Sequence, residues 1–181
     1  MPSAIFTIGH STRSMTEFAG LLQRAGVDFV IDVRAFPRSR TNPQFNFDTL
    51  PASLAELQVG YQHIQALGGR RGHRKDQGPS PNMYWDNLSF RNYADYAATE
   101  AFRAGLAGLR ELGRTHACAI MCAEAVWWRC HRRLIADRLI SDGEQVFHIM
   151  SLGRIETASL NPAAVRLHDG TLVYPGGGPG A

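Results

Sequence analysis

Lysine, cysteine and long apolar runs are all scarce in this chain of 181 residues. Eighteen of the nineteen basic residues are arginines and Lys75 is the single lysine, a bias that genome composition alone can produce. No apolar run approaches the roughly 20 residues that a membrane-spanning helix needs. The N-terminus lacks the charged start and long apolar core of a secretory signal. These absences favour a cytoplasmic protein that has no membrane partner.

The three cysteines cannot all pair, and a reducing compartment would keep them as thiols. Cys118 lies within an apolar stretch and is expected to be a buried small hydrophobe. The spacing of Cys122 and Cys130 would permit a disulfide, but the cytoplasmic expectation argues against a structural one.

Size and composition indicate one folded domain. Hydrophobic residues make up 44% of the chain and charged residues 19%, which is typical of a globular protein. The net charge of +3 is modest, but seven basic residues fall between positions 34 and 75. Basic loops favour an anionic ligand such as a phosphate or a nucleic acid, with an ordinary solvated surface as an equal alternative.

Apolar segments typical of strands alternate with segments of helical periodicity. Strands are predicted at 4–8, 29–33, 61–64, 117–122 and 146–149, and helices at 15–25, 48–57, 90–98, 100–112 and 130–141. Ser14 and Glu17 predict a capping box for the first helix, and Gly26 predicts its end. The order predicts an α/β fold, a Rossmann-like three-layer sandwich of about five mainly parallel strands with helices on both faces.

The pattern weakens after Ser151, so we expect an α/β domain over 1–151 and a C-terminal appendage over 152–181. The appendage contains a possible hairpin around Asp169 and Gly170, followed by a flexible tail rich in proline and glycine.

Polar side chains follow each predicted strand where it ends. Right-handed crossovers bring the carboxyl ends of parallel strands to one edge, where open α/β sheets bind ligands. The residues concerned are His10 and Ser11, Asp32 and Arg34, His63 with Gly68 and Gly69, Cys122 and Glu124, and His148. We therefore expect a cleft along this edge.

Six motifs in this order resemble the bacterial family catalogued as domain of unknown function 488. They are Gly9-His10-Ser11-Thr12, Asp32-Val33-Arg34, Asn42-Pro43-Gln44-Phe45-Asn46, Leu67-Gly68-Gly69-Arg70, Phe90-Arg91-Asn92-Tyr93-Ala94, and Cys122-Ala123-Glu124 with Cys130-His131-Arg132. The resemblance covers roughly residues 4–150. It implies a compact α/β domain and supplies no settled activity.

The leading hypothesis is a thiol enzyme, a hydrolase or transferase, that acts on a small anionic substrate. Cys122 is the expected nucleophile or redox centre, because a helix start and nearby arginines stabilise a thiolate. Glu124 and His10 are the expected proton-transfer groups. The expected substrate-binding residues are Ser11, Asp32, Arg34, Arg38, Gly68, Gly69, Arg129, Cys130, His131 and Arg132. This hypothesis requires no cofactor, and both the cofactor and the oligomeric state stay open.

A metal site is the first alternative. Cys122, Glu124, Cys130 and His131, with His10, are ligand types that zinc accepts. Their spacing is not that of a paired-cysteine knuckle, and consecutive residues such as Cys130 and His131 point in different directions on a helix.

A nucleic-acid-binding module is the second alternative. In this alternative, Phe36, Phe45, Tyr84 and Trp85 would stack on exposed bases. The phosphate contacts would come from basic residues of the two long loops, which are Arg38, Arg40, Arg70, Arg71, Arg74 and Lys75. No recognised nucleic-acid motif accompanies them.

Overall fold

Six strands form the central sheet of the protein, whose computed structural model describes residues 4–177. The strands are β1 (Ile5–Gly9), β2 (Phe29–Asp32), β3 (Gly60–His63), β4 (Cys118–Cys122), β5 (Val146–Ser151) and β6 (Arg154–Thr157). Their order across the sheet is β3-β2-β4-β1-β5-β6. The first five run parallel, and β6 is antiparallel to β5.

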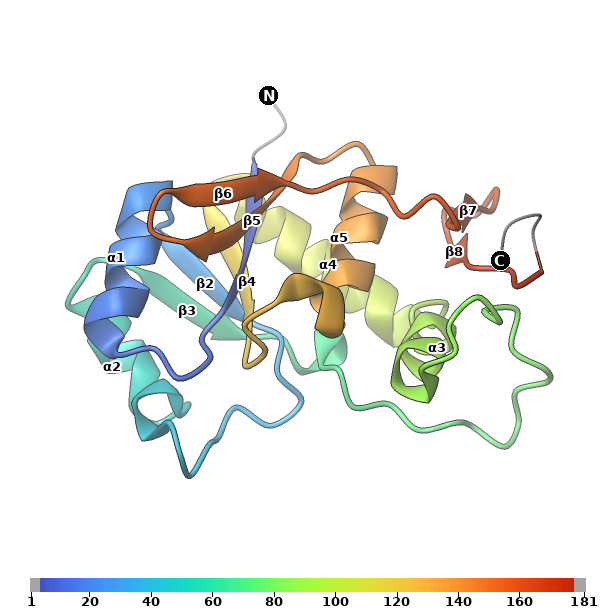
Figure 1. Cartoon of the computed structure of the whole chain (residues 1–181), viewed down its shortest axis with the longest axis horizontal. Helices are drawn as coiled ribbons and strands as arrows, with labels where there is room; N and C mark the ends of the chain where they lie inside the picture. Colours follow the sequence, from blue (N-terminus) through green and yellow to red (C-terminus); the bar gives the residue numbers. More distant parts are fainter. Residues whose placement is uncertain (1–3, 178–181) are drawn as a thin grey trace.

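Helices cover both faces of the sheet (Figure 1). They are α1 (Met15–Ala25), α2 (Leu50–Ala55), α3 (Leu88–Tyr96), α4 (Glu100–Gly113) and α5 (Arg132–Ser141), with short 3₁₀ turns η1 (Pro43–Phe45), η2 (Gln65–Leu67) and η3 (Trp127–Arg129). Phe18 of α1 and Leu54 of α2 belong to one apolar cluster, and Phe102 of α4 and Leu134 of α5 belong to the other. The predicted three-layer α/β sandwich is confirmed.

The predicted ends of the first helix are also confirmed. Glu17 N–H donates to the Ser14 hydroxyl at 3.1 Å, and Ser14 N–H donates to the Glu17 carboxylate at 3.3 Å. Gly26 ends the helix with a φ of 71°, a left-handed conformation that glycine adopts without a steric penalty.

Alternation along β4 decides which way its cysteines face. Cys118 and Cys122 point to the face covered by α4 and α5, whereas Met121 points to the face covered by α1 and α2. Cys118 is fully buried, as expected. Cys122 therefore ends β4 on the side where α5 begins.

Strand register brings the carboxyl ends of four strands together. Gly9 pairs with Cys122, and Asp32 pairs with both Met121 and His63. The two long loops, 33–49 and 68–87, leave the sheet at this edge and lie below it in Figure 1.

The chain beyond residue 151 contributes to the same structure. β6 extends the main sheet, and the small hairpin of β7 (Val165–Arg166) and β8 (Leu172–Val173) forms around the predicted Asp169–Gly170 turn. Tyr174 is buried and donates to Asp137 Oδ2 at 2.8 Å. Residues 178–181 of the predicted flexible tail lie outside the described residues.

Three helix starts differ from the predictions by two residues, and one of them is the helix predicted at 48–57, which begins at Leu50. The helix predicted at Phe90 begins at Leu88, because the Asn87 side chain accepts from the Ser89 backbone N–H at 2.9 Å. The helix predicted at Cys130 begins at Arg132, because Cys130 has an extended backbone. Within residues 4–177, no helix has the length and apolar character needed to cross a membrane.

Candidate active site

A cleft of about 1330 Å³ runs along the carboxyl edge of the sheet. The turns after β1 and β4 and the loops after β2 and β3 form its walls. Ten of the thirteen predicted site residues line it: His10, Ser11, Arg34, Arg38, Gly69, Cys122, Glu124, Arg129, Cys130 and His131. The other three, Asp32, Gly68 and Arg132, lie behind this lining and hydrogen-bond to residues of the wall.

Two thiols are in contact at the floor of the cleft. Cys122 Sγ and Cys130 Sγ lie 2.6 Å apart, and the two residues are 3% and 5% exposed. Cys122 is the last residue of β4, and Cys130 lies two residues before the first residue of α5. The segment between the two cysteines therefore brings the chain back to the carboxyl end of β4.

Arg132 is a buried cation beside this pair. Its Nε and its backbone N–H both donate to Cys130 Sγ at 3.4 Å. The remaining nitrogens donate to the Thr7 hydroxyl at 3.3 Å and to the Glu124 carbonyl oxygen at 2.7 Å. The side chain is 1% exposed, and no carboxylate in residues 4–177 forms an ion pair with it. Since a buried cation needs an anionic partner, a Cys130 thiolate is the group positioned to supply it.

His131 approaches the same sulfur from the other side. Its Nε2–H donates to the Val33 carbonyl oxygen at 2.8 Å, which leaves Nδ1 facing Cys130 Sγ at 3.5 Å. Cys130 and His131 precede the first residue of α5, so the expectation that helical geometry would separate them was wrong.

The surroundings push the pKa values of the two thiols in opposite directions. Burial by itself would raise the pKa of Cys130, but hydrogen bonds from Cys122 and His131 and the charges of His131 and Arg132 outweigh it and hold that pKa well below its ordinary value. Burial, together with the hydrogen bond and charge of Cys130, raises the pKa of Cys122 well above its ordinary value. Both directions favour the proton on Cys122 over Cys130.

A second buried network fixes the wall formed by the end of β2. Arg34 pairs in a bidentate manner with Asp32, at 2.9 and 2.7 Å, and also donates to the Phe45 carbonyl oxygen at 2.6 Å and to His10 Nε2 at 3.3 Å. Tyr61 adds a hydrogen bond to Asp32 at 2.6 Å. Four of the five N–H groups of Arg34 are thus used within the protein, which leaves little of this predicted anion clamp for a ligand.

His10 is neutral in this network. Its Nδ1–H donates to the Ser11 carbonyl oxygen at 2.8 Å, and its ring stacks on Phe45 with centroids 4.4 Å apart. Burial lowers the pKa of His10 from 6.5 to about 4, with the charge of Arg34 contributing. A neutral imidazole can accept a proton through Nε2, but only if Arg34 gives up its hydrogen bond.

The mouth of the cleft is rich in cations. Five arginines line it (Arg34, Arg38, Arg70, Arg71 and Arg129) against one acidic residue, Glu124. Arg38 lies 3.8 Å from Asp48, and Arg71 is held by the carbonyl oxygens of Gly68 and Gln65. Among residues 4–177, the side chains of Arg70 and Arg129 make no hydrogen bond or ion pair. These two are free to bind an anion.

The predicted Gly68–Gly69 pair serves close packing. A Cβ on Gly68 would lie 2.9 Å from the Ala35 Cα, and one on Gly69 would lie 2.4 Å from His131 Nδ1. Both distances are shorter than real carbon contacts allow, so glycine lets this loop press against the cleft wall.

Residues 14–139 match the family described as Domain of unknown function DUF488. The chain belongs to this family. The match covers Asp32, Arg34, Cys122 and the Cys130–Arg132 stretch, and it begins after His10. No curated protein and no solved structure matches the chain. The description of the DUF488 family carries no activity.

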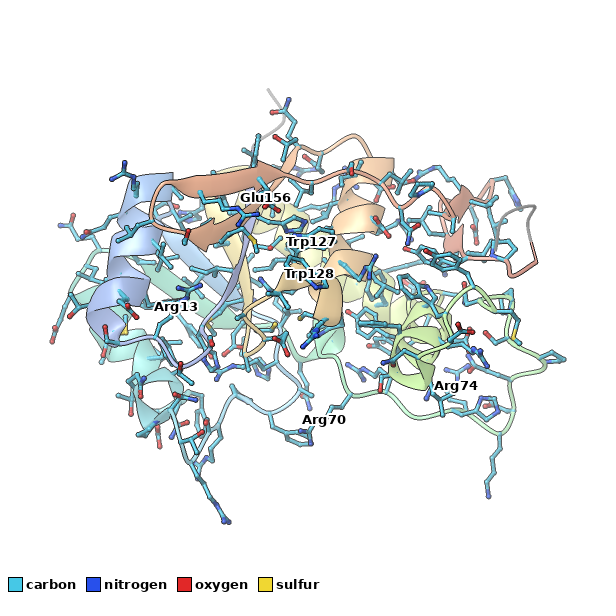
Figure 2. The ribbon with its side chains drawn as sticks, viewed as in Figure 1. Arg13, Arg70, Arg74, Trp127, Trp128 and Glu156 are labelled. Atoms are coloured by element: carbon cyan, nitrogen blue, oxygen red, sulfur yellow. The ribbon has the colours of Figure 1, made fainter. Side chains whose placement is uncertain are left out.

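Two residues that sequence reasoning missed support the buried arginine. Thr7 lies beside His148 in the pairing of β1 and β5, and the two side chains hydrogen-bond at 2.7 Å. Trp127 stacks on His148 at 4.5 Å and directs its indole N–H toward Glu156 at 3.4 Å (Figure 2). The sequence did contain a signal for Thr7, because it is a polar residue within the otherwise apolar β1. Side chains alternate between the two faces of a sheet along each strand, so Thr7 lies on the same face as Cys122.

The geometry of this DUF488 protein gives little support to the two alternative hypotheses, a metal site and a nucleic-acid-binding module. Within the part of the chain that the structure describes, no group of three or more His, Cys, Asp or Glu side chains is arranged to hold a metal ion. Of the four aromatic residues expected to stack on bases, Phe45 and Trp85 are buried, while Phe36 and Tyr84 are exposed.

Proposed function

We propose that the cleft is the active site of a thiol-dependent hydrolase or transferase that acts on an anionic, phosphate- or nucleotide-like substrate. The observation that carries this proposal is the buried guanidinium of Arg132, which contacts the Cys130 sulfur and, within residues 4–177, forms no ion pair with a carboxylate. A thiolate at the floor of a cleft is a nucleophile held ready for an electrophilic substrate. We propose the cytoplasm, where thiols stay reduced, as its compartment.

Cys130 is better supported as the nucleophile than Cys122, the candidate favoured by the sequence. Two N–H groups of Arg132 donate to Cys130 Sγ, and His131 Nδ1 lies 3.5 Å from it. The Cys122 thiol faces Cys130 Sγ and the Glu124 carbonyl oxygen, and the charge of Arg132 acts on it as well. In this proposal Cys122 keeps the proton. Glu124 at the cleft mouth and the neutral His10 are the groups able to accept a proton from an attacking water or hydroxyl.

The arginines support the substrate class. Arg70 and Arg129 face the cleft unpaired, and a smaller adjoining pocket of about 300 Å³ shares Arg70 and Arg71 with it and adds Arg74. Figure 2 shows Arg70 and Arg74 on the same loop. Since this pocket has no acidic lining residue, a substrate with two or more anionic groups fits the pair of sites.

Alkylation with a charged and an uncharged reagent tests the proposal. Iodoacetate is an anion and iodoacetamide is neutral, while both alkylate thiolates. We expect Cys130 to react with both reagents below the ordinary thiol pKa. The ratio of the iodoacetate rate to the iodoacetamide rate should exceed that of the urea-unfolded chain, because the arginines attract the anion.

Matched variants separate the two parts of this test. Arg70→Gln and Arg129→Gln should lower the iodoacetate rate and leave the iodoacetamide rate unchanged, and inorganic pyrophosphate should protect Cys130 from both reagents. Arg114, which is exposed and paired with Glu111 away from the cleft lining, provides Arg114→Gln as the control. Equal reagent ratios in the folded and unfolded chains would contradict the anionic substrate, and an ordinary titration of Cys130 would contradict the nucleophile.

A further inference from the structure

We infer that Cys130 and Cys122 form a reversible disulfide by reducing a hydroperoxide, with Cys130 as the thiol that is oxidised first and Cys122 as the thiol that resolves it. This inference rests on the thiolate assigned to Cys130 in the proposed function. It adds a second activity, and a modification site with a defined order of events, to the same cleft.

Contact between the two sulfurs is already present in the fold. Cys122 is fixed by β4, whose Cα partner at that position is Gly9, and Cys130 is fixed by its backbone hydrogen bond to the Trp127 carbonyl oxygen at 3.1 Å. The sulfurs lie 2.6 Å apart in this arrangement. Because the fold already places the two sulfurs in contact, resolution can follow oxidation without unfolding.

The unequal protonation of the pair sets the order of the two steps. A thiolate attacks a peroxide and a thiol does not, so Cys130 reacts first. Both residues line the cleft although each is 5% exposed or less, so the oxidant approaches from the cleft side. Cys118, at the other end of β4, is fully buried, does not line the cleft and takes no part.

The chemistry balances with the peroxide as the only oxidant. The Cys130 thiolate attacks the outer oxygen of the hydroperoxide, the O–O bond breaks, and the departing alkoxide takes a proton from water, which releases an alcohol and a hydroxide ion. The resulting Cys130 sulfenic acid is attacked by Cys122, the S–O bond breaks, and water leaves with the Cys122 proton. Two thiol sulfurs supply the two electrons that the peroxide accepts.

Arg132 favours the return to the reduced state. Disulfide formation removes the thiolate charge and leaves the buried guanidinium, 1% exposed, without its anionic partner. An uncompensated buried cation destabilises the oxidised form relative to the reduced one. A dithiol reductant such as dithiothreitol should therefore open the disulfide readily, and the oxidised protein should be unable to act as a nucleophile.

Hydrogen peroxide, followed by thiol counting on the denatured protein, tests the inference. We expect the three thiols of the wild-type chain to fall to one and to return to three with dithiothreitol. Peptide mapping should link Cys122 to Cys130. In Cys122→Ser, dimedone, which traps sulfenic acids, should label Cys130. In Cys130→Ser, thiol loss should slow by roughly tenfold or more, because the remaining thiols are protonated.

Cys118→Ala is the control, and it should lose two thiols as the wild-type chain does. Wild-type protein that keeps all three thiols, or that links Cys118, overturns the inference without relying on any variant. Dimedone labelling of Cys122 in Cys130→Ser at the wild-type rate would also overturn it. The proposed function fails separately, through the alkylation ratio of the reduced protein, in which no peroxide is present.

Discussion

Arg132 Nε lies 3.4 Å from Cys130 Sγ, and this contact joins the first turn of α5 to the floor of the cleft. The guanidinium is buried under Thr7 and the Glu124 carbonyl group. Such a cation is retained at a cost in desolvation unless an anion faces it. The thiolate that we propose for Cys130 therefore depends on this contact in the folded protein and not on the cysteine alone.

Replacing Arg132 should shift the titration of Cys130. Arg132→Gln should raise the pH midpoint of Cys130 alkylation by at least about one unit, which corresponds to roughly tenfold less thiolate below that midpoint. Arg132→Lys keeps the charge but loses the planar set of donors, so its midpoint should lie between those of Arg132→Gln and the wild type. Iodoacetamide rates across pH give all three values.

Arg138 supplies the control for this series, because it lies on the same helix and pairs with Asp142 at 3.2 Å, away from the sulfurs. Arg138→Gln should leave the alkylation midpoint where it is in the wild type. A midpoint that moves as much in Arg138→Gln as in Arg132→Gln would show that any loss of helix charge suffices, and would contradict the direct contact.

Gly69 and Gly72 provide a second matched pair, on the loop that faces His131. A Cβ at Gly69 would lie 2.4 Å from His131 Nδ1, while a Cβ at Gly72 would meet nothing within 4 Å. Gly69→Ala should displace the imidazole from Cys130, raise the alkylation midpoint and cost about 1–3 kcal/mol of stability. Gly72→Ala should do neither. Alkylation against pH and urea unfolding measure the two effects, and equal behaviour of the variants would count against the His131 contact.

The sequence was sufficient to predict the secondary-structure elements that surround the site. Apolar segments, helical periodicity and the Ser14–Glu17 capping box predicted elements that the structure contains, and the parallel strand order brought Gly9 and Cys122 to the same edge. The strand β6 was missed because the residues of Arg154–Thr157 are mostly exposed and carry no apolar alternation. An edge strand of this kind is specified by its pairing partner β5 and not by its own sequence.

The direction of the arginine side chains could not be read from the sequence. Arg34 and Arg132 were expected to clamp an anion at the cleft, yet Arg34 turns back to Asp32 two residues earlier and Arg132 is buried on Cys130. Proximity to a strand end or helix start predicts that an arginine is near the site. Whether its charge meets a ligand depends on partners such as Thr7 and Phe45, which only the folded chain brings near.

Asp32 should matter more for stability than for binding, because its oxygens accept from Arg34 and Tyr61 in a buried network. Asp32→Asn leaves the Arg34 guanidinium buried without a counter-charge, which should cost about 3–5 kcal/mol. Asp48→Asn removes an exposed pair with Arg38 and should cost less than about 0.5 kcal/mol. Urea unfolding of both variants makes the comparison, and an Asp32→Asn protein of wild-type stability would reject the structural role.

Stability should fall in mild acid, because two histidines are held neutral by the fold. Burial lowers the pKa of His10 and of His148 from 6.5 to about 4, and Arg132 adds to the effect at His148. The unfolded chain therefore takes up protons that the folded chain refuses, so this contribution is complete above pH 6.5 and is lost as the pH falls to about 4. Each histidine contributes at most about 3 kcal/mol.

His148→Gln should roughly halve the slope of unfolding free energy against pH across this window. His73→Gln, at an exposed position, should leave the slope unchanged. Urea unfolding at several pH values measures the slopes, and identical slopes for His148→Gln and the wild type would exclude His148 as a source of the acid sensitivity.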